Sequence, residues 1–334
     1  MGDEPPQTLE DEAETGPDSE LRQIRIGPQQ HSERLDRALA ALVPEFSRSY
    51  LQQLIEAGAV LLGDAVCRKP ARRVKVGEQG SIELRPTPQS QAFQPQAMPI
   101  DVVFEDEHLL VLNKPAALVV HPAPGHWSGT LLNGLLARDD AARLLPRAGI
   151  VHRLDKDTTG LMVVARSRAA MDALVQLIAA REVSRRYLAL AHRSWSGPAT
   201  RQVDAPVGRD PRNRLRMAVV DLHKSAGKPA FTLIEMQQNC EQGCWVRCTL
   251  QTGRTHQIRV HMASLGHPLV ADEVYGGAPA AGMQRQALHA YHLAFTHPMT
   301  GRALEFHAPL PADMRQALLA WGLRDTPCAD LPTS

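Results

Sequence analysis

The segment at residues 149–167, GIVHRLDKDTTGLMVVARS, places a His-Arg-Leu-Asp sequence between two apolar runs. A buried strand does not accept unpaired charges in its interior, because taking them out of water is costly. We therefore predict two strands interrupted by a loop that presents Arg153 and Asp155 at the mouth of a strand. Rigid scaffolds present functional groups on such loops. Taken alone, Asp155 could equally be a solvated turn residue.

The charge of the chain is unevenly distributed. Its formal net charge is +1, from 37 basic and 36 acidic residues. Eight of the acids lie in residues 1–20, which contain no base, so 28 acids face all 37 bases in the rest of the chain. This composition predicts a disordered acidic tail over 1–20 and a basic body suited to a polyanionic partner.

The chain lacks an apolar run of the ~18 residues that would span a bilayer, and an acidic start is unlike a signal peptide. We therefore predict a cytoplasmic protein without membrane contact, and we expect a monomer. Cys240, Cys244 and Cys248 recur every four residues. In an extended strand such spacing separates the outer two side chains widely, so ordinary free thiols are predicted. The densest histidine group, His256 and His261, is spaced five apart, which does not fit a helical zinc site, and we predict no metal.

Residues 33–85 are predicted to form a small module of two helices and a basic hairpin. Ser32 is expected to cap a helix that runs to about Leu42, and Ser47 to cap a second helix that closes at Gly58. The hairpin has a tight turn at residues 62–64. This module resembles the S4 RNA-binding domain, on the sequences RLD at 34–36, SRS at 47–49 and IEAG at 55–58.

The S4 resemblance implies RNA binding through phosphates and shape. The basic residues that it places in this role are Arg34, Arg48, Arg68, Lys69, Arg72 and Arg73. The alternative is that these charges form an ordinary solvated surface.

Residues 86–99 hold four prolines and four glutamines, and we predict an interdomain linker there. Residues 100–320 alternate many strands with few helices, which favours an α+β domain on a mixed, largely antiparallel sheet. One helix is predicted over residues 168–180, with Met171, Leu174, Val175 and Ile178 facing inward. Another is expected to be capped by Thr255 and closed by Gly266. Residues 321–334 are predicted to be a C-terminal tail.

Three neighbourhoods carry chemically useful residues: the loop with Asp155, the stretch REVSRRYLAL with Tyr187, and the stretch LQTGRTHQIRVHMASLGHP with Arg254 and Arg259. Each has an ordinary explanation by itself, since tyrosines at strand ends and arginines on helices are common. Together, and with NKPAALVVHP at 113–122, they closely resemble the motifs of the RluA-type pseudouridine synthases in order and approximate spacing. The resemblance covers roughly residues 33–315.

The resemblance implies that the chain isomerises uridine in RNA without a cofactor or metal, with Asp155 as the catalytic residue. By the same match Arg259 is the partner of Asp155, with Arg254 the less favoured choice. Arg153 would fill the space left by a flipped-out base, Tyr187 would stack on the uracil, and Ile258 would form an apolar floor.

The expected substrate is large-subunit (23S) ribosomal RNA, free or in a pre-ribosomal particle, at the helix 69 stem-loop. Two alternatives remain open. The same chemistry could act on transfer RNA or on another ribosomal site, or the chain could bind RNA without catalysis.

Overall fold

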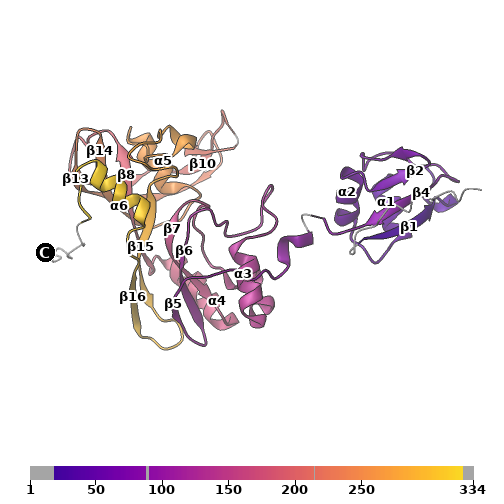
Figure 1. Ribbon diagram of the computed structural model, residues 1–334, viewed down its shortest axis with the longest axis horizontal. Helices are drawn as coiled ribbons and strands as arrows, with labels where there is room; N and C mark the ends of the chain where they lie inside the picture. The colour runs from indigo at the N-terminus through magenta and orange to yellow at the C-terminus, as the bar shows by residue number, and fades with distance from the viewer. Residues whose placement is uncertain (1–18, 88–89, 214, 326–334) are drawn as a thin grey trace, which may run out of the picture. The chain divides into compact units, whose positions relative to one another are not determined.

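The computed structural model describes residues 19–87, 90–213 and 215–325. The chain divides into two compact units, with the boundary in the sequence between Gln94 and Pro95 (Figure 1). Most of the predicted acidic tail (residues 1–18) and of the predicted C-terminal tail (326–334) lies outside the described residues. Within the described ranges no helix is long and apolar enough to cross a membrane.

The N-terminal unit packs two helices on a four-stranded sheet of order β1-β4-β2-β3. Leu35, Leu39, Leu51, Leu54 and Ile55 are fully buried between the helices and the sheet. The elements are β1 (Glu20–Arg25), η1 (Pro28–Gln30), α1 (Leu35–Leu42), α2 (Arg48–Glu56), β2 (Val60–Leu62), β3 (Ala65–Val66) and β4 (Gln79–Leu84). β1 pairs with β4 along its whole length, so the sheet begins at residue 20, before the module predicted from residue 33.

The predicted helix limits of this unit are correct at α2 and wrong at the start of α1. The Ser47 side chain accepts a hydrogen bond from the Tyr50 amide, and Gly58 has a φ of 78°. Ser32, however, does not cap α1, whose N-cap is Arg34. The Ser32 amide instead donates to the Val74 carbonyl, and the Val74 amide donates to the Glu33 carbonyl. Ser32 itself lies in a turn with a φ of 63°, and the helix begins only after this pairing, at Leu35.

The C-terminal unit is built on a nine-stranded sheet in the described residues, of order β5-β6-β7-β15-β8-β14-β13-β9 with β16 added beside β15 (Figure 1). Among the described strands only β7 and β15 pair in parallel, which confirms the predicted mixed, largely antiparallel α+β fold. The strands are β5 (Val102–Glu105), β6 (Leu109–Lys114), β7 (Thr159–Ala165), β8 (Ser184–His192), β9 (Thr200–Asp204), β13 (Phe231–Asn239), β14 (Gly243–Leu250), β15 (Leu288–Thr296) and β16 (Ala303–His307).

A second, three-stranded sheet and several helices complete this unit. The small sheet contains β10 (Val207–Arg209), β11 (Met217–Val219) and β12 (Gly227–Lys228). The helices are α3 (Leu131–Arg138), α4 (Arg168–Ala180), α5 (Gln257–Ser264) and α6 (Ala312–Ala320), with short turns η2 (Ser90–Phe93), η3 (Asp140–Leu144), η4 (Pro146–Gly149) and η5 (Glu273–Tyr275).

The helix α4 has the predicted bounds but not the whole predicted buried stripe. Ala170 and Leu174 are buried, Met171 and Ile178 pack at the edge of the core, and Val175 is 47% exposed. Successive helical residues point about 100° apart, so Val175 turns away from the face that Leu174 buries.

β7 is buried over all seven of its residues. Met162 and Val164 contribute to the core on one face of the sheet, and Leu161 and Val163 contribute to a second core on the other. A strand packed on both faces has little freedom to move. The loop that carries Asp155 therefore enters a rigid part of the fold.

Candidate active site

Asp155 lies in the loop that leads into β7. The predicted strand before this loop is not formed, because Ile150 makes only an isolated bridge with Val164. The predicted strand after it is β7. The loop is instead held by side chains from elsewhere: Lys114 donates to the Lys156 carbonyl at 2.8 Å, and Arg285 donates to the Asp157 carbonyl at 2.9 Å.

Lys114 is a residue that the sequence analysis assigned no role. Its side chain is buried, and Nζ also donates to the carbonyls of Pro115 and Leu118, at 2.7 and 2.9 Å. Three carbonyl acceptors satisfy the three donors of an ammonium group. Burial lowers the pKa of Lys114 to about 8. In the sequence, its position in the NKP motif at residues 113–115 was the signal that could have identified it. The Lys114 side chain fixes the backbone one residue after Asp155.

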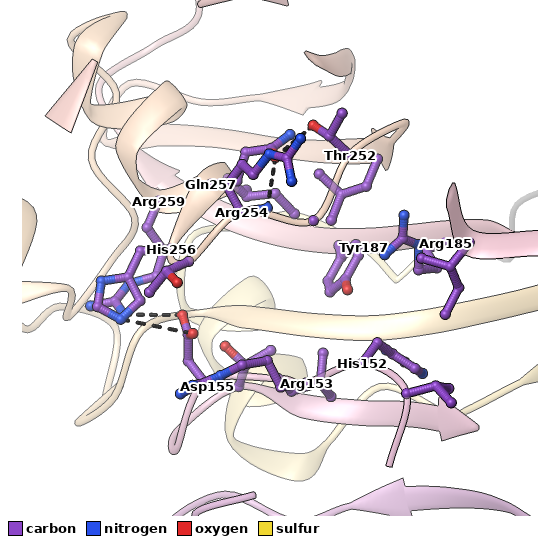
Figure 2. A pocket seen from close by; sticks show the side chains of 18 of the residues that line it. His152, Arg153, Asp155, Arg185, Tyr187, Thr252, Arg254, His256, Gln257 and Arg259 are labelled. Atoms are coloured by element: carbon purple, nitrogen blue, oxygen red, sulfur yellow. Dashed lines mark hydrogen bonds and ion pairs between the residues drawn. The ribbon is translucent and has the colours of Figure 1, made fainter. Parts of the chain in front are cut away.

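The predicted site residues of this unit come together around a cleft of about 450 Å³ (Figure 2). Arg153 and Asp155 come from the loop before β7, Tyr187 from β8, and Ile258 and Arg259 from α5. Asp155 and Arg259 are 104 residues apart in the sequence. Arg153 is exposed, whereas Tyr187 and Ile258 are buried.

Arg259 joins two carboxylates. Its Nη1 donates to Oδ2 of Asp155 at 3.1 Å, while Nε and Nη2 donate to the two oxygens of Asp272 at 2.7 and 2.8 Å. Asp272, which is buried, holds the guanidinium plane by this bidentate contact. Asp155 thus receives a single charge-assisted hydrogen bond in the described structure, and the carboxylate keeps free lone pairs beside the cleft. Arg254 instead donates to the Pro229 carbonyl.

His256 faces the other oxygen of Asp155, with Nε2 3.8 Å from Oδ1 (Figure 2). Its backbone has a φ of 57°, a conformation that costs an ordinary residue about 1 kcal/mol. Burial is the main cause that lowers the pKa of His256, so the ring is neutral at pH 7.

The hydroxyl of Tyr275 sets the tautomer of His256. It lies 2.8 Å from Nδ1 and accepts a hydrogen bond from the Met217 amide at 3.1 Å. Burial raises the pKa of Tyr275, so the hydroxyl keeps its hydrogen. That hydrogen is best donated to Nδ1, which places the imidazole hydrogen on Nε2. In this tautomer His256 presents a donor, not a lone pair, to Asp155.

Tyr187 and Arg185 both point into the cleft from β8, two residues apart on the same strand face (Figure 2). Burial raises the pKa of Tyr187 to about 12, so its hydroxyl is protonated at neutral pH. Arg185 lies in the same REVSRRYLAL stretch as Tyr187, but no role was predicted for it, nor for His256, Asp272 or Tyr275.

In the N-terminal unit, most of the residues predicted to bind RNA have partners within the protein. Arg34 and Arg48 both donate to the buried carboxylate of Asp36. Arg72 pairs with Glu78, and Arg73 donates to the Ser32 carbonyl. Arg68 makes a longer contact with the Glu56 carbonyl, at 3.4 Å, and Lys69 is exposed. Each guanidinium has further donors, so these contacts do not remove the predicted RNA-binding role.

The cysteines at 240, 244 and 248 are free thiols, as predicted. Burial raises the pKa of Cys244 to about 12, so it is not a reactive thiolate. In the described part of the chain, one group has the ligand types of a metal site: His292, Glu305 and His307, whose ligand atoms lie within 4.8 Å of one another. The positive charge of Arg186 beside His292 disfavours a cation there.

Two sequence profiles match the chain. The sequence profile described as RNA pseudouridylate synthase matches residues 108–264, and the S4 domain profile matches residues 33–79. The chain belongs to the RluA-type pseudouridine synthase family and carries an N-terminal S4 domain. It is an isomerase that converts uridine to pseudouridine.

The relatives named ribosomal large subunit pseudouridine synthase D are similar over most of the chain. The protein from Neisseria meningitidis serogroup B is 47% identical over 296 residues, which are 85% of this chain and 78% of the relative. The protein from Xanthomonas campestris pv. campestris is 42% identical over 325 residues, or 93% and 96% of the two chains. Among solved structures, human RNA pseudouridylate synthase domain containing 1 has a TM-score of 0.51 at 26% identity, covering 65% of this chain and 86% of that one.

Proposed function

We propose that this protein converts specific uridines of large-subunit (23S) ribosomal RNA to pseudouridine, with Asp155 as its catalytic residue. The observation that carries the catalytic assignment is the pairing of Asp155 with Arg259 at 3.1 Å beside a cleft of about 450 Å³. The names of the relatives support large-subunit RNA as the substrate. The helix 69 stem-loop as the target rests on the sequence resemblance.

The reaction breaks the N-glycosidic bond, turns the uracil, and joins its C5 to C1′ of the ribose. Positive charge develops on the sugar as the first bond breaks, and an ionised carboxylate can trap or stabilise it. Asp155 can do this by attack on C1′ or by removal of the 2′ hydrogen. Either step needs a lone pair that no donor of the protein occupies, and the single bond from Arg259 leaves one.

Arg259 provides the positive charge that faces Asp155 in the cleft. Desolvation favours a neutral carboxyl group, and an adjacent guanidinium opposes this. Asp272 holds Arg259 in place through two hydrogen bonds, so the counter-charge does not need to be positioned by the substrate.

The target base must leave the RNA stack to reach Asp155, at a cost of a few kcal/mol. We propose that exposed Arg153 fills the vacated space, that the ring of Tyr187 stacks on the uracil, and that Ile258 forms the apolar floor of the cleft. The N-terminal S4 domain would hold the surrounding RNA through Lys69 and the free donors of its arginines.

We also propose that the protein acts as a monomer in the cytoplasm, on ribosomal RNA or a pre-ribosomal particle. Light scattering of the purified protein tests the monomer.

The decisive experiment maps pseudouridines across ribosomal and transfer RNA by carbodiimide primer extension in a strain lacking the gene. We expect sites in large-subunit RNA to be lost, to return with the wild-type gene, and to stay absent with Asp155→Asn. Sites lost in transfer RNA instead would contradict the proposed substrate. Sites restored by Asp155→Asn would contradict the catalytic assignment.

A further inference from the structure

Two arginines in the cleft are equally buried but have opposite surroundings. Arg185 and Arg259 each expose 6% of their surface. Arg259 binds the carboxylates of Asp155 and Asp272. For Arg185, in contrast, no hydrogen bond or ion pair is found with any described residue, and its Nε is buried without a partner. A buried charge without a counter-charge costs several kcal/mol, which a protein normally avoids.

The side chains that line the cleft offer Arg185 no unpaired negative charge. Six arginines line the cleft, and Asp155, already paired with Arg259, is the only acidic residue among the lining side chains. His152 lies nearby, but burial, its main influence, and then the charge of Arg185 lower its pKa to about 3, so it is neutral. The Nε2 atom of His152 accepts a hydrogen bond from the Val163 amide.

The loop opposite Arg185 is shaped to receive its guanidinium. A Cβ atom at position 253 would lie 2.9 Å from Nη1 of Arg185, so Gly253 leaves the space that this group occupies. The polar groups of that loop are used internally: the hydroxyl of Thr252 and the amide of Arg254 both donate to the side chain of Gln257. The loop therefore provides room for Arg185 but no charge.

We propose that Arg185 is the binding site for a backbone phosphate of the RNA strand that carries the flipped-out uridine. A phosphodiester supplies the missing negative charge, and its oxygens match the donors of a guanidinium group. A uracil carbonyl could also accept a hydrogen bond but would leave the charge uncompensated. This inference rests on the proposed function, because it assumes that a uridine within RNA enters this cleft.

The test uses the RNA stem-loop around a uridine that the mapping experiment assigns to this protein. The protein carries Asp155→Asn so that binding is measured without turnover. Each of the two phosphates flanking the uridine is replaced in turn by a neutral methylphosphonate. With Arg185 present, one replacement should raise the Kd about tenfold. With Arg185→Met, the Kd should already be raised and should not respond to either replacement.

Salt dependence gives an independent measure. Loss of one phosphate contact should reduce the slope of log K against log salt by about 0.7–1. If Arg185→Met responds to the methylphosphonates as the parent does, or if its salt slope is unchanged, the phosphate site is wrong. If Arg185→Met raises the Kd by the same factor for the unmodified stem-loop and for both methylphosphonate RNAs, Arg185 contacts the base or supports the fold.

Two controls separate binding from folding. Arg185→Met removes a buried unpaired charge, so the Tm of the free protein should not fall; a clear fall would show a structural partner and overturn the proposal. Gly253→Ala displaces the guanidinium without changing the charge. It should weaken RNA binding when Arg185 is present and have no further effect beside Arg185→Met. Failure of the catalytic assignment would appear separately, as restored modification by Asp155→Asn.

Discussion

Asp36 in the N-terminal unit and Asp155 in the C-terminal unit both pair with arginines, and the two carboxylates differ in how many donors surround them. Asp36 is fully buried and accepts hydrogen bonds from Arg34, Arg48 and Gln52, five in all. Asp155 accepts a single one from the described residues, donated by Arg259, and its side chain is 16% exposed at the cleft. The saturated carboxylate can only hold structure, whereas the unsaturated one retains lone pairs for a substrate.

The hydrogen bonds around Asp36 lower the pKa of its carboxyl group. Burial alone would raise the pKa of Asp36, but the hydrogen bonds from Arg34, Gln52 and Arg48 hold it well below the usual range. A carboxylate so stabilised contributes to the free energy of unfolding and has no basicity to use in a reaction. The same residue types therefore make a structural joint in one unit and a candidate reactive group in the other.

Asp155→Asn should have the largest effect on activity. We expect tritium release from C5-labelled uridine in RNA to fall at least about a thousandfold. Arg259 remains paired with Asp272, so the stability should change by less than about 0.5 kcal/mol. Normal tritium release from the purified variant would refute the assignment.

Asp36→Asn makes the same chemical change at the carboxylate that accepts five hydrogen bonds. It should lower the stability of the N-terminal unit, whereas Asp155→Asn should lower activity. Loss of the charge weakens several hydrogen bonds at once, and we expect the N-terminal unit to lose about 1–3 kcal/mol of stability. Hydrogen exchange of the α1 amides measures this loss, and Asp155→Asn is the matched control. Unchanged protection of α1 would mean that the five bonds add nothing to stability.

The stabilisation from Asp36 should depend on pH with a definite sign. Because its pKa is lowered in the folded state, its contribution is present above about pH 4 and is lost as the pH falls through the native pKa. The exchange protection of α1 should therefore fall in acid in the wild type and fall less in Asp36→Asn. Equal slopes in the two proteins would count against the depressed pKa.

Tyr275→Phe tests the second side of Asp155, where His256 presents Nε2. Without the hydroxyl, His256 can place its hydrogen on either nitrogen, and a lone pair can face Oδ1 of Asp155. We expect kcat to fall about tenfold with little change in KM. Tyr50→Phe, which removes a hydroxyl that donates to the Arg85 carbonyl, is the matched control and should leave kcat unchanged. A kcat within twofold of wild type for Tyr275→Phe would remove His256 from the site.

Tyr187→Phe should have the smallest effect. The hydroxyl stays protonated at neutral pH because burial raises its pKa to about 12, and phenylalanine keeps the ring for stacking. We expect kcat to fall by less than about threefold at pH 7. A much larger loss would make the hydroxyl an obligatory base and would separate its role from stacking.

The sequence was sufficient for features that depend on local pattern. The α+β class, the bounds of α4, the Ser47 cap and the turn at Gly58 follow from apolar spacing and from side chains that act on their own neighbours. Two of the errors have the same cause. Ser32 and Val175 have the residue types expected of a cap and of a buried face, but pairing with Val74 and the packing of α4 decided otherwise.

The motif order in the sequence determined the family and pointed to Asp155, Arg259 and Tyr187 as a set. The tertiary structure alone decided how the carboxylates are used. Asp36 and Asp155 both occur in an Arg-Leu-Asp sequence, and no local pattern states that one meets five hydrogen bonds and the other one. The number of donors around a carboxylate depends on segments that fold against it from far along the chain. That number sets whether its lone pairs are occupied by structural hydrogen bonds or remain open to a substrate.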